Sequence, residues 1–489
     1  MSADGRYVAF VSNATNLVAG DTNGFADVFV RDHQSGETER VSVATGGTEA
    51  NNNSNTPLPD VGSSISGDGR YVAFESDASN LVPGDTNNVR DVFVHDRDTD
   101  TTERVSVDST GAETNAGGSM PSISGDGRYV AFQSTATNLV PGDTNFVGDV
   151  FVHDRDTDTT ERVSVDSSGA EANFGSIEAS ISGDGRYVAF TSDATNLVAG
   201  DTNTSRDVFV HDRDTGLTER VSVDSTGTQA NSGRSDGASI SGDGRYVAFG
   251  SEATNLVPGD TNGLRDVFVH DRDTGATERV SVDSTGTQAN ASNLGLSISG
   301  DGRYVAFESG ATNLVPGDTN GTRDVFVRDR TNGIIQRASL RTFYQQANGN
   351  SVFPSISGDG RYVAFHSNAT DLVDNDTNNR TDVFLKFALA PRPLAAVGPT
   401  SIARGTTGQI TITGSWFDPS FLQVAVGPFE GTTVDQVSVQ NPNTTAVVTI
   451  TVAADAETGS RDLYVTNPGN AWDVNAVGSD VCNDCLTIT

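Results

Sequence analysis

The fold is decided by a unit seen in residues 239–283, which read SISGDGRYVAFGSEATNLVPGDTNGLRDVFVHDRDTGATERVSVD. The Asp of its Gly-Asp-Gly turn (Ala-Asp-Gly in the first copy) recurs at Asp4, Asp68, Asp126, Asp184, Asp243, Asp301 and Asp359. The first interval is 64 residues, and every later one is 58 or 59. A fixed period of this size indicates one supersecondary unit stacked on copies of itself. The chain therefore carries seven copies of one structural unit.

Each copy predicts four short antiparallel strands. In residues 239–283 they are expected at 239–241, 245–249, 266–271 and 277–282, with tight turns at 242–244 and 273–275 and a longer loop between the second and third strands. No segment keeps a 3.6-residue apolar period over ten residues, which excludes helical repeats. Four antiparallel strands per repeat are typical of a β-propeller blade. The predicted fold class is all-β, with a seven-bladed β-propeller over residues 1–390.

The run Ser-x-Ser-x-Asp-Gly-Arg-Tyr-Val-Ala-Phe resembles the WD40-like repeat of TolB-type propellers. The resemblance covers about residues 1–387, with Gly in the place of that family's usual Pro before the Asp in six copies and Ala in the first. It implies the propeller fold. It does not imply one function, because such propellers serve as periplasmic scaffolds, binding modules and accessory domains of enzymes.

Closure of the ring is left open by the sequence. The first copy begins at its second strand, and the last ends at Lys386 without the Thr-Glu-Arg-Val-Ser-Val strand. Unpaired strand edges are a liability, so we consider three ways of closing the ring. Residues upstream of a trimmed N-terminus would supply a strand, the segment 387–397 would close the gap, or a neighbouring chain would donate a strand and build a polymer by β-augmentation.

The loop between the second and third strands carries the pattern Asp-x-Asn-x-x-x-Asp in every copy. This pattern brings hard oxygen ligands together in a flexible loop, as calcium requires, with up to one ion per blade. The predicted metal ligands are Asp21, Asn23, Asp27, Asp85, Asn87, Asp91, Asp143, Asn145, Asp149, Asp201, Asn203, Asp207, Asp260, Asn262, Asp266, Asp318, Asn320, Asp324, Asp376, Asn378 and Asp382.

An alternative interpretation needs no metal. Asp and Asn are common turn residues because their side chains bond nearby backbone amides. An upstream Asn that becomes Asp371 in the last copy fits either a ligand or a turn cap. The sequence leaves both interpretations open, and a bound calcium would have a stabilising role.

Other recurrent side chains are interpreted as structural. His95, His153, His211 and His270 share one repeat position and cannot converge on one metal, so they are expected at the surface. The Arg that follows each Gly-Asp-Gly turn is expected to form a salt bridge between blades. No nucleophile elbow, zinc-protease motif or phosphate loop is present.

Composition limits the partners. The chain has 489 residues and a net charge of −34, which repels phosphate backbones and argues against nucleic-acid binding. No apolar run approaches the length of about 20 residues that spans a bilayer. Recurrent Asp at fixed repeat positions favours divalent cations over solubility alone.

Residues 391–399 are predicted to be a linker, and residues 400–489 a second domain. Alternating strands at 409–414, 446–452 and 461–469, separated by turn residues, are typical of a β-sandwich. The segments Ile412–Phe417 and Tyr464–Gly469 resemble IPT/TIG-type immunoglobulin-like modules, which implies an extracellular spacer or adhesion module. Cys482 and Cys485 are expected to form a small disulfide loop or to remain free thiols.

Together these features predict a non-enzymatic binding or structural protein, extracellular, on the cell surface or periplasmic. Its expected partners are a protein or glycan ligand on the loop face, or further copies of itself. The variable connections from each fourth strand to the next copy carry Phe174, Arg234, Leu294, Phe343, Tyr344 and Phe353 nearby, and they are the candidate ligand face. The alternative is a carbohydrate- or peptide-active enzyme with its site on that face.

Overall fold

The computed structural model describes residues 1–55, 63–231, 233–341, 345–388, 395–397, 401–417, 423–427, 431–439, 443–466 and 480–488. Every regular element in these ranges is a β-strand, as the sequence predicts. The chain divides into two compact units, Met1–Leu389 and Ala390–Thr489.

The first unit contains seven antiparallel sheets, numbered 1 to 7 here in chain order. Each is built from one repeat, and neighbours in a sheet are consecutive in sequence. The first strands of sheets 2 to 7 are β4 (Ser63–Ile65), β8 (Gly118–Ile123), β12 (Ser176–Ile181), β16 (Ser235–Ile240), β20 (Asn293–Ile298) and β24 (Ser351–Ile356).

The second and third strands are present in all seven sheets. The second strands are β1 (Tyr7–Ser12), β5 (Tyr71–Ser76), β9 (Tyr129–Ser134), β13 (Tyr187–Ser192), β17 (Tyr246–Ser251), β21 (Tyr304–Ser309) and β25 (Tyr362–Ser367). The third strands are β2 (Asp27–Asp32), β6 (Asp91–Asp96), β10 (Asp149–Asp154), β14 (Asp207–Asp212), β18 (Asp266–Asp271), β22 (Asp324–Asp329) and β26 (Asp382–Phe387).

The fourth strands occur in sheets 1 to 6. They are β3 (Thr38–Arg40), β7 (Thr101–Arg104), β11 (Thr159–Arg162), β15 (Leu217–Arg220), β19 (Ala276–Arg279) and β23 (Ile334–Arg337). Within the described ranges, sheet 1 therefore lacks a first strand and sheet 7 lacks a fourth.

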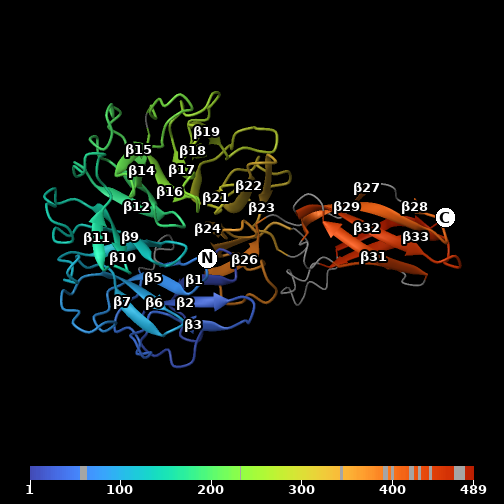
Figure 1. Ribbon diagram of the computed structural model, residues 1–489, viewed down its shortest axis with the longest axis horizontal. Helices are drawn as coiled ribbons and strands as arrows, with labels where there is room; N and C mark the ends of the chain where they lie inside the picture. The colour runs from blue at the N-terminus through green and yellow to red at the C-terminus, as the bar shows by residue number, and fades with distance from the viewer. Residues whose placement is uncertain are drawn as a thin grey trace. The chain divides into compact units, whose positions relative to one another are not determined.

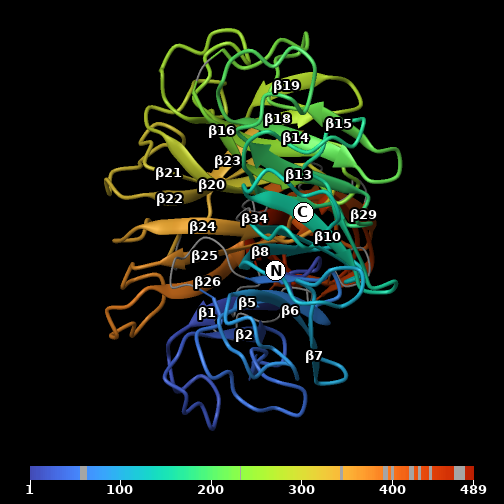
Figure 2. The ribbon, with the colours of Figure 1, turned by 90° about the vertical axis from the view of Figure 1, so that its left-hand side faces the viewer.

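Backbone hydrogen bonds join the seven sheets into a closed ring. The amide of Ala3 donates to Gly67 O, and the series continues through Gly125, Gly183, Gly242, Gly300 and Gly358, each bond 2.8–2.9 Å long. The amide of Asp359 donates back to Ala3 O at 2.8 Å. Figure 1 shows the sheets following one another around a centre, with β26 of the last repeat beside β1 of the first, and Figure 2 shows the same order from the side. This radial arrangement is a propeller-type fold.

The ring closes through the contact that joins the other repeats. At an internal junction the turn glycine Gly244, with φ of +73°, lies against the ring of Tyr187 in the preceding sheet, and Arg272 stacks on that ring 4.2 Å from its centroid. At the closing junction Gly5 lies against Tyr362, and His33 takes the place of the arginine, 5.3 Å from the tyrosine centroid. The first and seventh repeats are thus direct neighbours.

The hydrophobic core lies between adjacent sheets, and a similar apolar cluster recurs at successive junctions. Each junction buries valines, one phenylalanine of a second strand and one of a third strand. An Ala and a Leu from the loop that follows the second strand pack with them. Phe209, Phe249 and Phe268 are completely buried. Alternation along the strands explains this, because a sheet packed on both faces needs apolar side chains on both.

The second unit consists of two four-stranded sheets. One contains β27 (Ala395–Val397), β29 (Thr407–Phe417), β32 (Asn443–Val452) and β31 (Thr432–Val439) in that order. The other contains β28 (Ser401–Ile402), β34 (Asp480–Ile488), β33 (Gly459–Thr466) and β30 (Gln423–Gly427). Both contribute to one apolar cluster that includes Ile410, Val448, Leu486 and Ile488. Strand β27 lies inside the segment predicted to be a linker; residues 391–394 and 398–399 of that segment are outside the described residues.

Candidate functional site: the carboxylate–arginine cluster of the repeats

Two elements build the recurrent site of each repeat. The last Asp of the predicted triplet opens the third strand, and an Arg ends the fourth. In sheet 1, Phe29 is paired with Arg40 in an antiparallel register. Asp27, two residues before Phe29, therefore lies opposite Ser42, two residues after Arg40. Alternate residues of a strand share a face, which places Asp27, Arg40 and Ser42 on the same side of the sheet.

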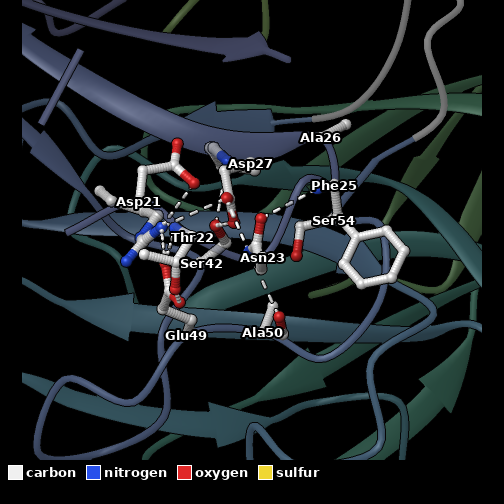
Figure 3. Close-up of polar contacts among 12 residues, drawn as sticks. Asp21, Thr22, Asn23, Phe25, Ala26, Asp27, Ser42, Glu49, Ala50 and Ser54 are labelled. Atoms are coloured by element: carbon white, nitrogen blue, oxygen red, sulfur yellow. Dashed lines mark hydrogen bonds and ion pairs between the residues drawn. The ribbon is translucent and has the colours of Figure 1, made fainter. Parts of the chain in front are cut away.

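The guanidinium of Arg40 lies between the predicted metal ligands of the first repeat. Its Nη1 atom is 3.3 Å from Asp21 Oδ1, 3.4 Å from Asp27 Oδ2 and 2.7 Å from Glu49 Oε1. Figure 3 shows the three carboxylates converging from separate segments. The hydroxyl of Ser42 donates to Asp27 Oδ1 at 2.5 Å. The carboxylate of Asp27 is thus held by charge and by hydrogen bonds.

The Asn of the triplet fastens the loop. Asn23 Nδ2 donates to Asp27 Oδ2 at 2.9 Å and to the carbonyl oxygen of Ala50 at 3.2 Å. Its Oδ1 accepts the amide of Phe25 at 2.9 Å, as in the turn interpretation of the sequence. Asn23 therefore ties the loop both to itself and to the segment after the fourth strand (Figure 3).

The same arrangement recurs in sheets 1 to 6. In each, one arginine Nη1 lies 2.9–3.5 Å from oxygens of both triplet aspartates. The arginines are Arg40, Arg104, Arg162, Arg220, Arg279 and Arg337. The structure thus brings together the first eighteen predicted metal ligands in six groups of three, each group around a guanidinium.

Sheet 7 keeps the triplet without the arginine. Asn378 Nδ2 donates to Asp382 Oδ2 at 3.2 Å, and the amide of Arg380 donates to Asn378 Oδ1 at 2.8 Å. Asp376 Oδ1 is buried and has no hydrogen-bond partner. The last three predicted ligands therefore form the same loop but face no fourth strand within the described residues.

Several first aspartates hold an oxygen that is buried without a hydrogen bond. These include Asp21 Oδ1, Asp143 Oδ1, Asp201 Oδ1, Asp260 Oδ1 and Asp376 Oδ1. Burial, with the nearby charge of Asp91, raises the pKa of Asp85 to about 6, and burial raises the pKa of Asp21, Asp143 and Asp260. Buried oxygens of this kind can accept a further cation or water.

The fit to a metal ion is mixed. Buried oxygens that accept no hydrogen bond favour an added cation, whereas in six repeats an arginine lies between the two aspartates, where a shared ion would bind. Among the residues that the structure describes, no three His, Cys, Asp or Glu side chains form a group that could hold a metal ion. Calcium, which would also use Asn and carbonyl oxygens, stays a prediction.

Sequence reasoning missed the other half of the cluster. The fourth strand ends at the Arg of Thr-Glu-Arg-Val-Ser-Val, and the Ser follows two residues later. Glu49, Glu113 and Glu171 also contact the arginine in three repeats. The signal was available, because an Arg recurring as regularly as two Asp is a candidate charge partner. Only the strand pairing shows that they meet.

The histidine prediction is wrong. His95, His153, His211 and His270 are buried, with 3–6% of their surface exposed. The Nδ1 atom of each is 2.8–2.9 Å from a threonine Oγ1 of the fourth strand. Burial lowers the pKa of all four. The third strand is covered on both sides, which the sequence pattern did not reveal.

The role expected for the arginine after each turn is also corrected. Arg245 pairs in a bidentate manner with Asp271 of its own sheet, at 2.8 and 2.7 Å. The bridge between sheets comes from a different arginine, the one after His-Asp, which pairs with a Glu of the preceding fourth strand, as Arg213 does with Glu161 at 2.6 Å.

The predicted ligand face is only partly apolar. Phe174 is 54% exposed, and Phe146, in the loop before β10, is 80% exposed and was not anticipated. Arg234 lies 3.6 Å from Asp236, Leu294 pairs within its sheet, and Phe353 packs edge-on against His366. Phe343 and Tyr344 lie outside the described residues, as do the side chains of Cys482 and Cys485.

Comparisons with known proteins add little. No family model matches the chain, and no curated protein matches it. A solved structure of a TolB protein from Agrobacterium tumefaciens is similar at 15% identity and a TM-score of 0.37, covering 78% of this chain and 98% of that one. The propeller-type fold therefore rests on the ring of sheets described above. No helix in the described residues has the length and apolar character needed to cross a membrane.

Proposed function

We propose that this protein is a non-enzymatic binding or structural protein: a seven-bladed β-propeller followed by an immunoglobulin-like module. One observation carries the proposal. The same loop, arginine and serine recur in six sheets with nearly the same distances, so the most elaborate polar site of the molecule belongs to the architecture of each repeat. An active site, by contrast, brings a particular set of catalytic residues together at one position in the molecule.

Calcium stabilisation is part of the proposal. Asp21, Asp143 and Asp201 each hold a buried oxygen that accepts no hydrogen bond and lies 3.2–3.4 Å from an arginine, and these oxygens support a cation beside the loops. An ion would reduce the repulsion among carboxylates in a chain with a net charge of −34.

We propose that the protein works outside the cytoplasm: in the periplasm, on the cell surface or in the extracellular medium. Calcium sites of extracellular modules have dissociation constants of about 10⁻⁴–10⁻³ M. Weak sites in loops of this kind would be occupied only where calcium is that concentrated. The exposed rings of Phe146 and Phe174 support binding of a protein or glycan on the loop face.

Thermal unfolding with excess calcium and with chelator, together with metal analysis, tests the calcium part. Stoichiometric calcium and a higher Tm would support ion-stabilised loops. An unchanged Tm and no bound metal would reduce the loops to turns closed by arginine. Turnover of glycan or peptide substrates by the purified chain would contradict the non-enzymatic assignment.

A further inference from the structure

The seventh sheet has an open position that the first six fill. Strand β26 ends the sheet, and no described residue takes the place of a fourth strand beside it. Phe384 is 8% exposed, whereas its counterpart Phe326 in sheet 6 is completely buried. A groove of about 510 Å³ runs along this edge, lined by Val373, residues 375–378 and residues 382–386 of β26.

Sheet 6 shows what the missing strand would supply. Arg337 Nη1 donates to Asp324 Oδ2 at 2.9 Å and lies 3.2 Å from Asp318 Oδ1. Ser339 Oγ donates to Asp324 Oδ1 at 2.6 Å and accepts the amide of Val325 at 3.1 Å. One arginine and one serine, two residues apart on an extended strand, therefore satisfy both aspartates of the loop.

Asp376 and Asp382 are the counterparts of Asp318 and Asp324 in the groove of sheet 7. Asp376 Oδ1 is buried without a hydrogen bond. Asp382 bonds Asn378, with no Arg or Ser from a fourth strand among the described residues. Within the described residues, the groove thus combines an unpaired strand edge, a phenylalanine that is 8% exposed and two carboxylates that lack the arginine of their counterparts.

Among the described residues, no segment fills this position. Each fourth strand of the described residues is held in its own sheet, so a second copy could donate one only by opening a sheet. An edge with free backbone groups binds extended peptide by strand addition, and side-chain pockets give the specificity.

We propose that the edge of β26 binds an extended segment of a partner polypeptide containing Arg-x-Ser flanked by aliphatic residues. The segment adds antiparallel to β26 as a fourth strand, its Arg pairs with Asp376 and Asp382, and its Ser donates to Asp382. This inference rests on the proposed binding role only in taking the partner to be a polypeptide.

The experiment uses the full chain and a labelled peptide with the sequence of residues 275–283, GATERVSVD, followed by fluorescence anisotropy. We expect saturable binding that weakens at least tenfold when Arg279 of the peptide sequence is replaced by Gln, a change that cannot affect folding of the protein. Asp382→Asn and Asp376→Asn in the protein should weaken binding in the same way. Asp374→Asn is the matched control, since it removes the same charge from the same loop outside the groove.

Each other outcome overturns the inference. Equal binding of the Arg and Gln peptides, or of a scrambled peptide, would show that the carboxylates do not select the strand. Exclusion of the peptide by calcium alone would make the groove an ion site. Concentration-dependent oligomers that block the peptide would make a second copy the occupant. The calcium-dependent Tm of the protein would be unaffected by failure of the peptide to bind, so the proposed function is judged separately.

Discussion

The turn glycines show how one residue type meets two separate demands. Gly244 and Gly259 both have φ near +75°, where a side chain is strained. A Cβ at Gly244 would lie 2.1 Å from Tyr187 Cδ2, whereas a Cβ at Gly259 would meet nothing within 4 Å. Gly259 is thus needed for conformation alone, and Gly244 for conformation and for close packing of neighbouring repeats.

Alanine at these positions separates the two costs. We expect Gly259→Ala to lower the free energy of unfolding by about 1 kcal/mol, the cost of the backbone conformation. Gly244→Ala should lower it by roughly 1–3 kcal/mol more, because the base of a tyrosine ring cannot move aside easily. Denaturant unfolding of both variants measures the difference. Equal losses would mean that the tyrosine contact is loose.

The buried histidines predict acid sensitivity. Burial lowers the pKa of His95, His153, His211 and His270 below the ordinary value of 6.5. The folded state then resists protonation that the unfolded state accepts, so stability is complete above about pH 6.5 and falls as the pH drops toward the lowered values. The raised pKa of Asp85, about 6, acts in the opposite sense, since protonation relieves its burial.

Arginine already occupies the histidine position in the first and sixth repeats, as Arg31 and Arg328. Between pH 7.5 and 5, the Tm of a variant with His→Arg at all four positions should fall by less than half as much as the Tm of the unchanged protein. The reason is that four of the six histidines are removed. An unchanged fall would assign the acid sensitivity to carboxylates.

At the scale of the element, each of sheets 1 to 6 is held by a buried cluster of one arginine and two aspartates. Arg220 has 9% of its side chain exposed and contacts Asp201 and Asp207, which are almost fully buried. Removing one partner of such a group leaves an uncompensated buried charge. We expect Arg220→Gln to lower the free energy of unfolding by about 3–5 kcal/mol.

The control for that variant is Arg206→Gln. Arg206 pairs with Asp193, whose side chain is 46% exposed, so the loss should stay below about 1 kcal/mol. Calcium distinguishes the two models of the loop. Calcium that restores the Tm of Arg220→Gln, but not of Arg206→Gln, would show that ion and arginine compete for one place.

The sequence was sufficient for the elements and insufficient for their partners. The sequence predicts the second and third strands of this repeat at 245–249 and 266–271, and the structure has them at Tyr246–Ser251 and Asp266–Asp271. The triplet loops were likewise predictable, because turn residues act locally. Arg279 could not be placed beside Asp260 and Asp266 from the sequence, because that contact depends on strand register and crosses 13 to 19 positions. The burial of His270 was missed for the same reason, because its partner Thr277 bonds Val223 of the preceding repeat.

At the scale of the molecule, the ring is closed by the repeats themselves. None of the three closures considered from the sequence is needed to bring the first and seventh repeats together: Gly5 against Tyr362 and Asp359 bonded to Ala3 already do so. Within the described residues, sheet 1 lacks a first strand and sheet 7 lacks a fourth, and these missing strands do not affect closure. A ring can therefore be continuous near its axis and still have an unfilled position at its rim.

This closure predicts that the terminal junction contributes as much stability as an internal one. Tyr362 packs against Gly5 and His33 as Tyr187 packs against Gly244 and Arg272. We expect Tyr362→Ala and Tyr187→Ala each to lower the free energy of unfolding by about 2–3 kcal/mol, because both remove a ring from a junction between sheets. Denaturant unfolding monitored by circular dichroism gives both values. A loss below about 0.5 kcal/mol for Tyr362→Ala, with the full loss for Tyr187→Ala, would mean that the first and seventh repeats are apart in solution, because a tyrosine at an open end has no neighbouring sheet to stabilise.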